Sequence, residues 1–174
     1  YTEARRTADQ FYNMQKYYMQ AGDLHLPYAF SPDYHYAMSI EKEYDASLIG
    51  LHYQKRDSLV EALRHRNIKV LYELGLVYDE YRIENNKAKI GLNWSSLMDI
   101  NARTFEIMAM HQIPVINRLP HLDELGLHEG HHYLGFDSTP EAVDKVVWAL
   151  SNPDEAKAIA NSAYHAIQPH TYDA

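Results

Sequence analysis

The side chains best placed to do chemistry gather in one stretch, in which a polar loop precedes a carboxylate and apolar runs flank both. The stretch from Lys89 to Arg118 is KIGLNWSSLMDINARTFEIMAMHQIPVINR. A helix that begins near Asn101 would direct free backbone N–H groups and the positive end of its dipole at the preceding loop, which suits a phosphate. Glu106 would then lie about one turn into the helix, where a carboxylate can accept hydrogen bonds from adjacent ribose hydroxyls. The stretch therefore predicts an anion and sugar site, and a solvated helical glutamate is the alternative.

The elements that would position these groups alternate between strands and helices. The runs Ile90–Leu92 and Ile113–Ile116 are short and β-rich, as buried parallel strands are. Phe105, Met108 and Ala109 recur at the spacing of one helix face. Further strands are expected at 46–51, 68–73 and 132–136, and further helices at 55–66, at 77–87 and in two closing segments. This alternation predicts an α/β fold with a Rossmann-like doubly wound parallel sheet, which binds ligands beyond the carboxyl ends of its strands.

The organisation of the chain suggests one domain and an appendage. Residues 45–174 carry the alternating pattern and form the predicted nucleotide-sugar-binding domain. Residues 4–21 are polar and aromatic and are expected to form a helix, followed by a crossing segment at 22–44. We interpret residues 1–44 as the remnant of a partner domain. Since the sequence starts at Tyr1 without methionine, we expect a piece of a longer protein.

Composition disfavours several classes of function. The 174 residues include 24 acidic and 16 basic side chains, a formal net charge of −8, so no nucleic acid partner is expected. The absence of cysteine excludes disulfides and thiolate metal sites. We find no signal-peptide pattern and no apolar run near the roughly 18 residues that span a bilayer. A cytoplasmic protein without a transmembrane segment is therefore expected.

The order of the motifs resembles the nucleotide-sugar-binding C-terminal half of a GT-B glycosyltransferase, among the group 1 glycosyl transferases and of the spore-maturation-protein type. The landmarks are YDASLIG with a basic KR pair after it, KIGLN, N-x-RTFEIMA, IPVIN, an acidic turn at Asp123 and Glu124, and a helix after NPDE. The resemblance implies transfer of a sugar from a nucleoside-diphosphate sugar to an acceptor hydroxyl, with retention and without a metal or other cofactor. It also implies that this chain is mainly the donor half and that a preceding domain of the same protein is missing.

The resemblance also implies roles for individual residues. Glu106 matches the glutamate that binds the nucleotide ribose. Arg56, or its neighbour Lys55, matches the basic position that neutralises the departing diphosphate, a task that suits a guanidinium. Arg56 and Glu124, near the second acidic position, are the candidate catalytic residues. The other candidate donor-binding residues surround the loop and the helix start: Asn93, Ser96, Asn101 and Arg103.

Alternatives remain for these residues and for the chain as a whole. The KR pair could be an exposed helix start, and Arg103 could make a structural ion pair. Many retaining members carry two glutamates eight residues apart, but here Met98 stands eight residues before Glu106. The first acidic function is therefore absent or moved to Asp99, and SSLMDIN replaces the usual glycine-rich loop. A non-catalytic module of the same fold, binding a nucleotide or a protein, stays open.

A second motif competes with this interpretation. His128, Glu129 and His132 match H-E-x-x-H, a zinc-protease signature. That chemistry requires both histidines on one face of a helix. Gly130 lies inside the motif and a predicted strand follows it directly, so we predict a histidine-rich loop and no metal site.

Overall fold

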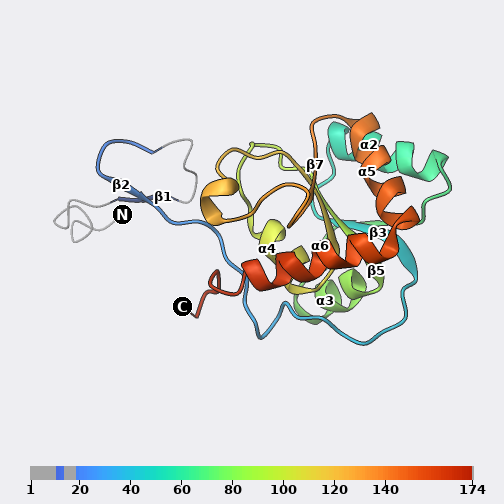
Figure 1. The fold of residues 1–174 in the computed structure, drawn as a ribbon, viewed down its shortest axis with the longest axis horizontal. Helices are drawn as coiled ribbons and strands as arrows, with labels where there is room; N and C mark the ends of the chain where they lie inside the picture. Colours follow the sequence, from blue (N-terminus) through green and yellow to red (C-terminus); the bar gives the residue numbers. More distant parts are fainter. Residues whose placement is uncertain (1–10, 14–18, 174) are drawn as a thin grey trace.

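The structure, a computed structural model, describes residues 11–13 and 19–173. A five-stranded sheet forms its centre, with every strand parallel to its neighbours in the order β4-β3-β5-β6-β7 (Figure 1). The strands are β3 (Tyr44–Ile49), β4 (Val70–Glu73), β5 (Ala88–Asn93), β6 (Ile113–Asn117) and β7 (Leu134–Phe136). Their apolar runs are continuous because helices bury both faces of the sheet.

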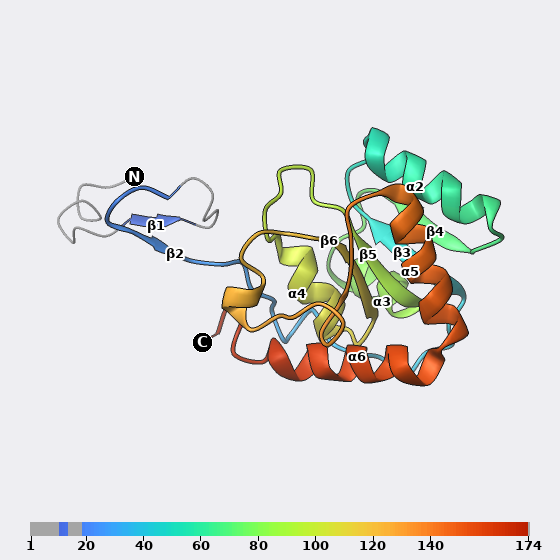
Figure 2. The same cartoon turned by 45° about the horizontal axis from the view of Figure 1, so that its top comes forward.

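The two faces of the sheet have separate cores, as alternate residues of one strand show. Leu48 of β3 packs with α2 (Gln54–His65) and α5 (Thr139–Ser151), whereas Ile49 packs with α3 (Tyr78–Asn86). On β6, Val115 belongs to the first core and Ile116 packs with α4 (Ala102–Ala109) and the last turns of α6 (Pro153–Ala166). Figure 2 shows these layers. The predicted α/β fold with a doubly wound parallel sheet is confirmed.

The strand order reverses beside β3, and this creates a place for a ligand. From β3 the chain forms β4 on one side, and then returns to form β5 on the other side. The loops that leave β3 and β5 at their carboxyl ends therefore diverge and leave a crevice between them. In open parallel sheets, ligands bind in this crevice.

The helix predicted at residues 4–21 is wrong where the structure describes that segment. Phe11–Asn13 form β1, which pairs in parallel with β2 (Asp23–His25). Residues 4–10 and 14–18 lie outside the described residues. Adjacent aromatic residues favour a strand over a helix, and pairing with β2 overrides the weak helical pattern.

The crossing segment is anchored to the end of the chain. Phe30 is 3% exposed and packs in the same core as Ile167. Its N–H donates to the carbonyl of His170 and its carbonyl accepts from the N–H of Tyr172, both at 3.1 Å. No helix in the described part of the chain has the length and apolarity to cross a membrane.

Candidate functional site

A cavity of about 390 Å³ occupies the crevice between the ends of β3 and β5 and the start of α4. The predicted site residues that line it are Arg56, Ser96, Asn101, Arg103 and Glu106. The sequence analysis did not identify the rest of its lining, which is Tyr28, Gly50, Leu51, Tyr53 and Ala102. The cavity lies where a Rossmann-like sheet holds its ligand.

Arg56 supplies a buried positive charge to this cavity. It is 7% exposed, and its Nε and Nη2 donate to the carbonyl of Trp94 at 3.1 and 2.9 Å, while Nη1 donates to Leu51 at 3.0 Å. Burial lowers the pKa of Arg56, against the opposing effect of Tyr53, whose ring centroid lies 4.7 Å from the guanidinium carbon. An arginine nevertheless stays protonated at neutral pH. Carbonyl dipoles therefore hold this cation in one orientation.

Arg103 adds a second cation, which makes fewer contacts with the rest of the protein than Arg56. A Cβ on Gly50 would lie 2.8 Å from Nη2 of Arg103 and 3.3 Å from Nη1 of Arg56, so both guanidinium groups approach the same glycine. Arg103 lies 5.8 Å from the centroid of the Tyr81 ring. Within the described part of the chain, no carboxylate oxygen lies within 4.0 Å of either guanidinium. The cavity therefore holds two cations that form no direct ion pair with a described carboxylate, and the structural ion pair considered for Arg103 is not formed among these residues.

The first turn of α4 is also open to an anion. Asn101 is the N-cap residue, but its side chain makes no capping hydrogen bond. Its Oδ1 instead accepts from Nδ2 of Asn93 at 2.9 Å, and Asn93 also donates to Oγ1 of Thr104 at 3.2 Å. Asn93 is fully buried and does not line the cavity, so it positions Asn101 and the helix start. The free N–H groups of the first turn can thus serve a ligand.

Glu106 is held in place and is not a freely solvated helix residue. Its side chain is 17% exposed, its Oε2 accepts from the Tyr81 hydroxyl at 2.6 Å, and its Oε1 lies 3.7 Å from Nε2 of His35. Burial, together with the charge of Glu106, raises the pKa of Tyr81 far above its usual value, so the hydroxyl stays protonated and donates. Nδ1 of His35 accepts from the N–H of Ser31 at 3.2 Å, which places the proton of the neutral ring on Nε2. The carboxylate therefore has a defined orientation.

Glu106 also forms a wall of a second, aromatic cavity of about 370 Å³. The other residues that line this aromatic cavity are Tyr34, His35, Leu76, Val77, Tyr78 and Tyr81. The rings of Tyr34 and Tyr78 lie 5.7 Å apart, and Tyr78 is 70% exposed with a left-handed backbone (φ 49°). Such a conformation is uncommon for a large side chain and occurs at binding sites. A cationic cavity and an aromatic cavity thus adjoin at one carboxylate.

Besides Asn93, two predicted residues lie outside both cavities. Lys55 is exposed on α2, with its ammonium 5.8 Å from the centroid of the Trp94 ring. Of the basic pair, Arg56 is therefore the residue that points inward. Glu124 lies in the 3₁₀ turn Asp123–Leu125, where its Oε1 is 2.8 Å from Nδ1 of His121. Its role on the donor side stays a prediction.

Side-chain hydrogen bonds stabilise the loop between β5 and α4. The N–H of Ser95 donates to Oδ1 of Asn117 at 2.7 Å, and the Ser95 hydroxyl donates to the carboxylate of Asp99. Met98 adopts a left-handed backbone (φ 54°) without being glycine, and its sulfur accepts from Nδ2 of Asn117 at 3.7 Å. Asp99 therefore supports the loop, and its side chain does not line the cavity. Among the described lining residues of the cationic cavity, Glu106 alone carries a carboxylate.

The H-E-x-x-H motif forms a turn. His132 accepts from the N–H of His128 through Nδ1 at 2.9 Å, and Glu129 pairs in a β-bridge with Tyr133. The carboxylate of Glu129 binds Arg118 through two hydrogen bonds of 2.8 Å each. The described residues contain no group of three or more side chains placed to hold a metal ion. Glu129 is a structural ion-pair partner in this turn.

Arg118 joins three carboxylates at the end of β6, those of Glu129, Asp137 and Glu141. The hydrogen bond from Arg118, with a smaller contribution from the N–H of Asp137, lowers the pKa of Glu141 from 4.5 to about 2. A lowered pKa in the folded state adds stability above the unfolded pKa, and this stability is lost as the pH falls from 4.5 toward 2. The cluster fixes the histidine-rich turn onto α5 most firmly near neutral pH.

We expect Glu141→Gln to lower the free energy of unfolding by about 1 kcal/mol at pH 7, since the pair is partly exposed, and by clearly less at about pH 3. Urea unfolding at both pH values measures the difference. Glu61→Gln removes an exposed carboxylate of α2 and is the matched control, for which little change is expected at either pH. An equal loss for Glu141→Gln at both pH values would contradict the ion-pair assignment.

The fold and the placement of the cavity define a Rossmann-like domain of the GT-B kind. The chain belongs to the glycosyl transferase-like family, whose family model matches residues 35–174. A comparison with curated proteins gives no match.

Solved structures show where this fold occurs. A sucrose-phosphate synthase from Thermosynechococcus elongatus has a TM-score of 0.62 at 10% identity, over 87% of this chain and 49% of that chain. S. aureus TarM, solved in complex with fondaparinux, alpha-GlcNAc-glycerol and UDP, has a TM-score of 0.61 at 13% identity, over 95% of this chain and 39% of that chain. This chain therefore spans half or less of the length of either solved chain. At these identities the likeness concerns the fold.

Proposed function

We propose that this chain is the donor-binding half of a glycosyltransferase that uses a nucleoside-diphosphate sugar. The observation that carries the proposal is the cationic cavity at the strand-order reversal, where Arg56, Arg103 and the uncapped start of α4 face one space with Glu106 at its border. Two cations without carboxylate partners suit a diphosphate. The carboxylate suits the ribose hydroxyls, and the aromatic cavity on its far side suits the nucleobase.

The chemistry that follows is transfer of the sugar to an acceptor hydroxyl. The bond between the anomeric carbon and the diphosphate oxygen breaks, and negative charge develops on the leaving diphosphate. Arg56 stabilises that charge from a fixed position and Arg103 adds a second positive charge, which lowers the barrier without a metal ion. Glu106 orients the donor and does not react. Retention at the anomeric carbon and the spore-maturation-protein type rest on the motif resemblance.

The acceptor site and the catalytic base belong, in this proposal, to a preceding domain. Among the described residues that line the cavity, Glu106 is the one that carries a carboxylate. Leu51 and Leu97 are 70% and 62% exposed, Leu51 in the lining of the cavity and Leu97 next to Ser96 in the adjoining loop. Apolar side chains at such a rim suit contact with a second domain that closes over the donor.

The test is calorimetric titration of the chain with UDP, GDP and ADP in the presence of a chelator. We expect one of them to bind selectively, because the aromatic cavity discriminates the base while the cationic cavity binds the shared diphosphate. The matching nucleoside, which lacks the diphosphate, should bind at least tenfold more weakly, since charged hydrogen bonds each contribute about 1.5–3 kcal/mol. Equal binding of nucleoside and nucleoside diphosphate would refute the placement of the phosphates.

The rival function is a module of the same fold that binds a protein. The exposed Leu51 and Leu97 favour it, because apolar rims also serve protein partners. Such a module would bind none of the three nucleotides in the same titration, and Glu106→Ala would leave its partner binding unchanged.

A further inference from the structure

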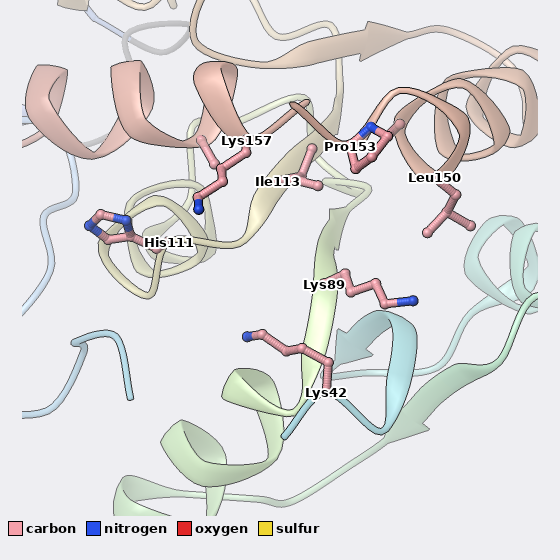
Figure 3. Close-up of a pocket in the computed structure, with 9 residues that line it drawn as sticks. Lys42, Lys89, His111, Ile113, Leu150, Pro153 and Lys157 are labelled. Carbon is pink, nitrogen blue, oxygen red and sulfur yellow. The ribbon is translucent and has the colours of Figure 1, made fainter. Parts of the chain in front are cut away.

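Another cavity, of about 340 Å³, lies at the opposite ends of the strands from the cationic cavity. Lys42 lies two residues before β3, Lys89 is the second residue of β5, and His111 lies two residues before β6. These positions are at the amino ends of parallel strands, whereas the cationic cavity lies at the carboxyl ends. Figure 3 shows Lys157 reaching this amino-end cavity from α6, on the side opposite Lys42. The two sites are therefore separated by the length of the strands.

The amino-end cavity contains two ammonium groups without carboxylate partners. Lys89 is compensated, because its Nζ lies 2.9 Å from Oδ1 of Asp45. Lys42 donates to the backbone carbonyl of Asn86 at 2.5 Å, and burial lowers its pKa. Neither Lys42 nor Lys157 has a carboxylate oxygen within 4.0 Å among the described residues. In a chain with a formal net charge of −8, two such cations in one cavity indicate an anion site.

The rest of the amino-end cavity is apolar. The residues that form this surface come from β6, α5 and α6, and they are Ile113, Ala149, Leu150, Pro153 and Ala160. His111 closes one end, with its ring 3.9 Å from that of Tyr164. A hydrated inorganic ion would leave this apolar surface unused. A ligand with an anionic head and an apolar body would contact both parts of the cavity.

We propose that the amino-end cavity binds a small organic dianion, of the class of phosphate monoesters with an apolar substituent, between Lys42 and Lys157. A phosphate monoester carries about −1.5 to −2 charges at pH 7, which matches two ammonium groups. Its substituent lies against Ile113 and Leu150. This site does not depend on the donor site being a nucleotide site.

The test is a titration of the chain with phenyl phosphate, followed by NMR of methyl and amide groups. We expect shifts at Ile113, Leu150 and Ala160, with inorganic phosphate binding at least tenfold more weakly. Lys157→Gln, on the surface of α6, should weaken binding by about tenfold, and Lys42→Gln likewise. Lys69→Gln removes an exposed lysine outside the cavity and should change affinity less than twofold.

Three outcomes would overturn the proposal. The first is shifts confined to the donor cavity around Arg103. The second is equal affinity for phenyl phosphate and inorganic phosphate. The third is equal affinity in Lys157→Gln and Lys69→Gln. The titration with nucleoside diphosphates reports on the donor cavity separately, so failure of either proposal can be recognised without the other.

Discussion

Replacing Arg103 with alanine is expected to remove most of the affinity of this chain for a nucleoside diphosphate. Arg103 lines the cationic cavity and has no carboxylate within ion-pair distance among the described residues. Its loss removes one charge-assisted contact of about 2 kcal/mol or more, which corresponds to roughly thirtyfold or more in the dissociation constant. Stability should change little, because Arg103 does not hold other parts of the chain together as Arg56 does. Calorimetric titration measures the affinity, and thermal unfolding checks the fold.

Lys55→Ala is the matched control for Arg103→Ala, because it removes a positive charge near the cavity that does not line it. We expect less than about a threefold loss, as for an exposed charge. Arg103→Lys keeps the charge but loses the fork geometry, so an intermediate loss is expected. Equal losses for Lys55→Ala and Arg103→Ala would show that net charge, and not this cavity, determines binding.

Gly91→Ala is expected to destabilise the fold by about 3 kcal/mol, at the upper end for overpacking of a core. Gly91 lies in β5 beneath α4, and a Cβ there would lie 2.4 Å from Cγ2 and 2.8 Å from Cγ1 of Ile107. It would also lie 3.0 Å from Oε1 of Gln112, whose Nε2 donates to Ser47 and to the carbonyl of Asn85. Both side chains are buried, Ile107 at 1% and Gln112 at 0% exposed, so we expect α4 to shift. Urea unfolding measures the loss.

A double-mutant cycle separates this clash from a general effect of the substitution. Ile107→Ala removes the atoms that the new Cβ would meet, and alone should cost about 2–5 kcal/mol through the cavity it leaves. The Gly91→Ala and Ile107→Ala double variant should lose at least about 1 kcal/mol less than the sum of the two single losses. Additive losses would mean that the close packing of β5 against α4 is not what requires glycine.

Most of the fold could be predicted because local patterns and tertiary packing agree. β5 and β6 appear in the sequence as short apolar runs since both of their faces are buried, and α4 shows one apolar face because only that face meets the sheet. The error at Phe11–Asn13 arose where the pattern was weak and pairing with a distant segment decided the structure. Such pairing leaves little trace in a local window.

The lining of the cationic cavity was partly predictable for a topological reason. Loops after neighbouring parallel strands meet at one edge of the sheet, and the structure places the candidate residues Arg56, Ser96 and Arg103 around one cavity there. The choice between Lys55 and Arg56 also had a signal in the sequence. Arg56 shares its helix face with Leu59, Val60 and Leu63 at i+3, i+4 and i+7, and all four residues are buried.

The partners of Glu106 could not be predicted from the sequence. His35 comes from the crossing segment and Tyr81 from α3, and no spacing rule links either to α4. Gly50 had a weak signal, as a glycine directly after a strand at the carboxyl edge, where two cations approach the backbone. Glu124 was chosen from its position in the motif, but its side chain does not line the cavity.

The most direct test of the central claim, that Glu106 binds the ribose of a nucleoside diphosphate, combines a change in the protein with a change in the ligand. The nucleoside diphosphate that binds is compared with its 2′-deoxy form by calorimetry, in the unsubstituted chain and in Glu106→Ala. We predict that the unsubstituted chain prefers the ribose form by about tenfold and that Glu106→Ala reduces this preference to less than about twofold, because the hydroxyl and its acceptor are coupled. A preference that is the same in both proteins would contradict the account.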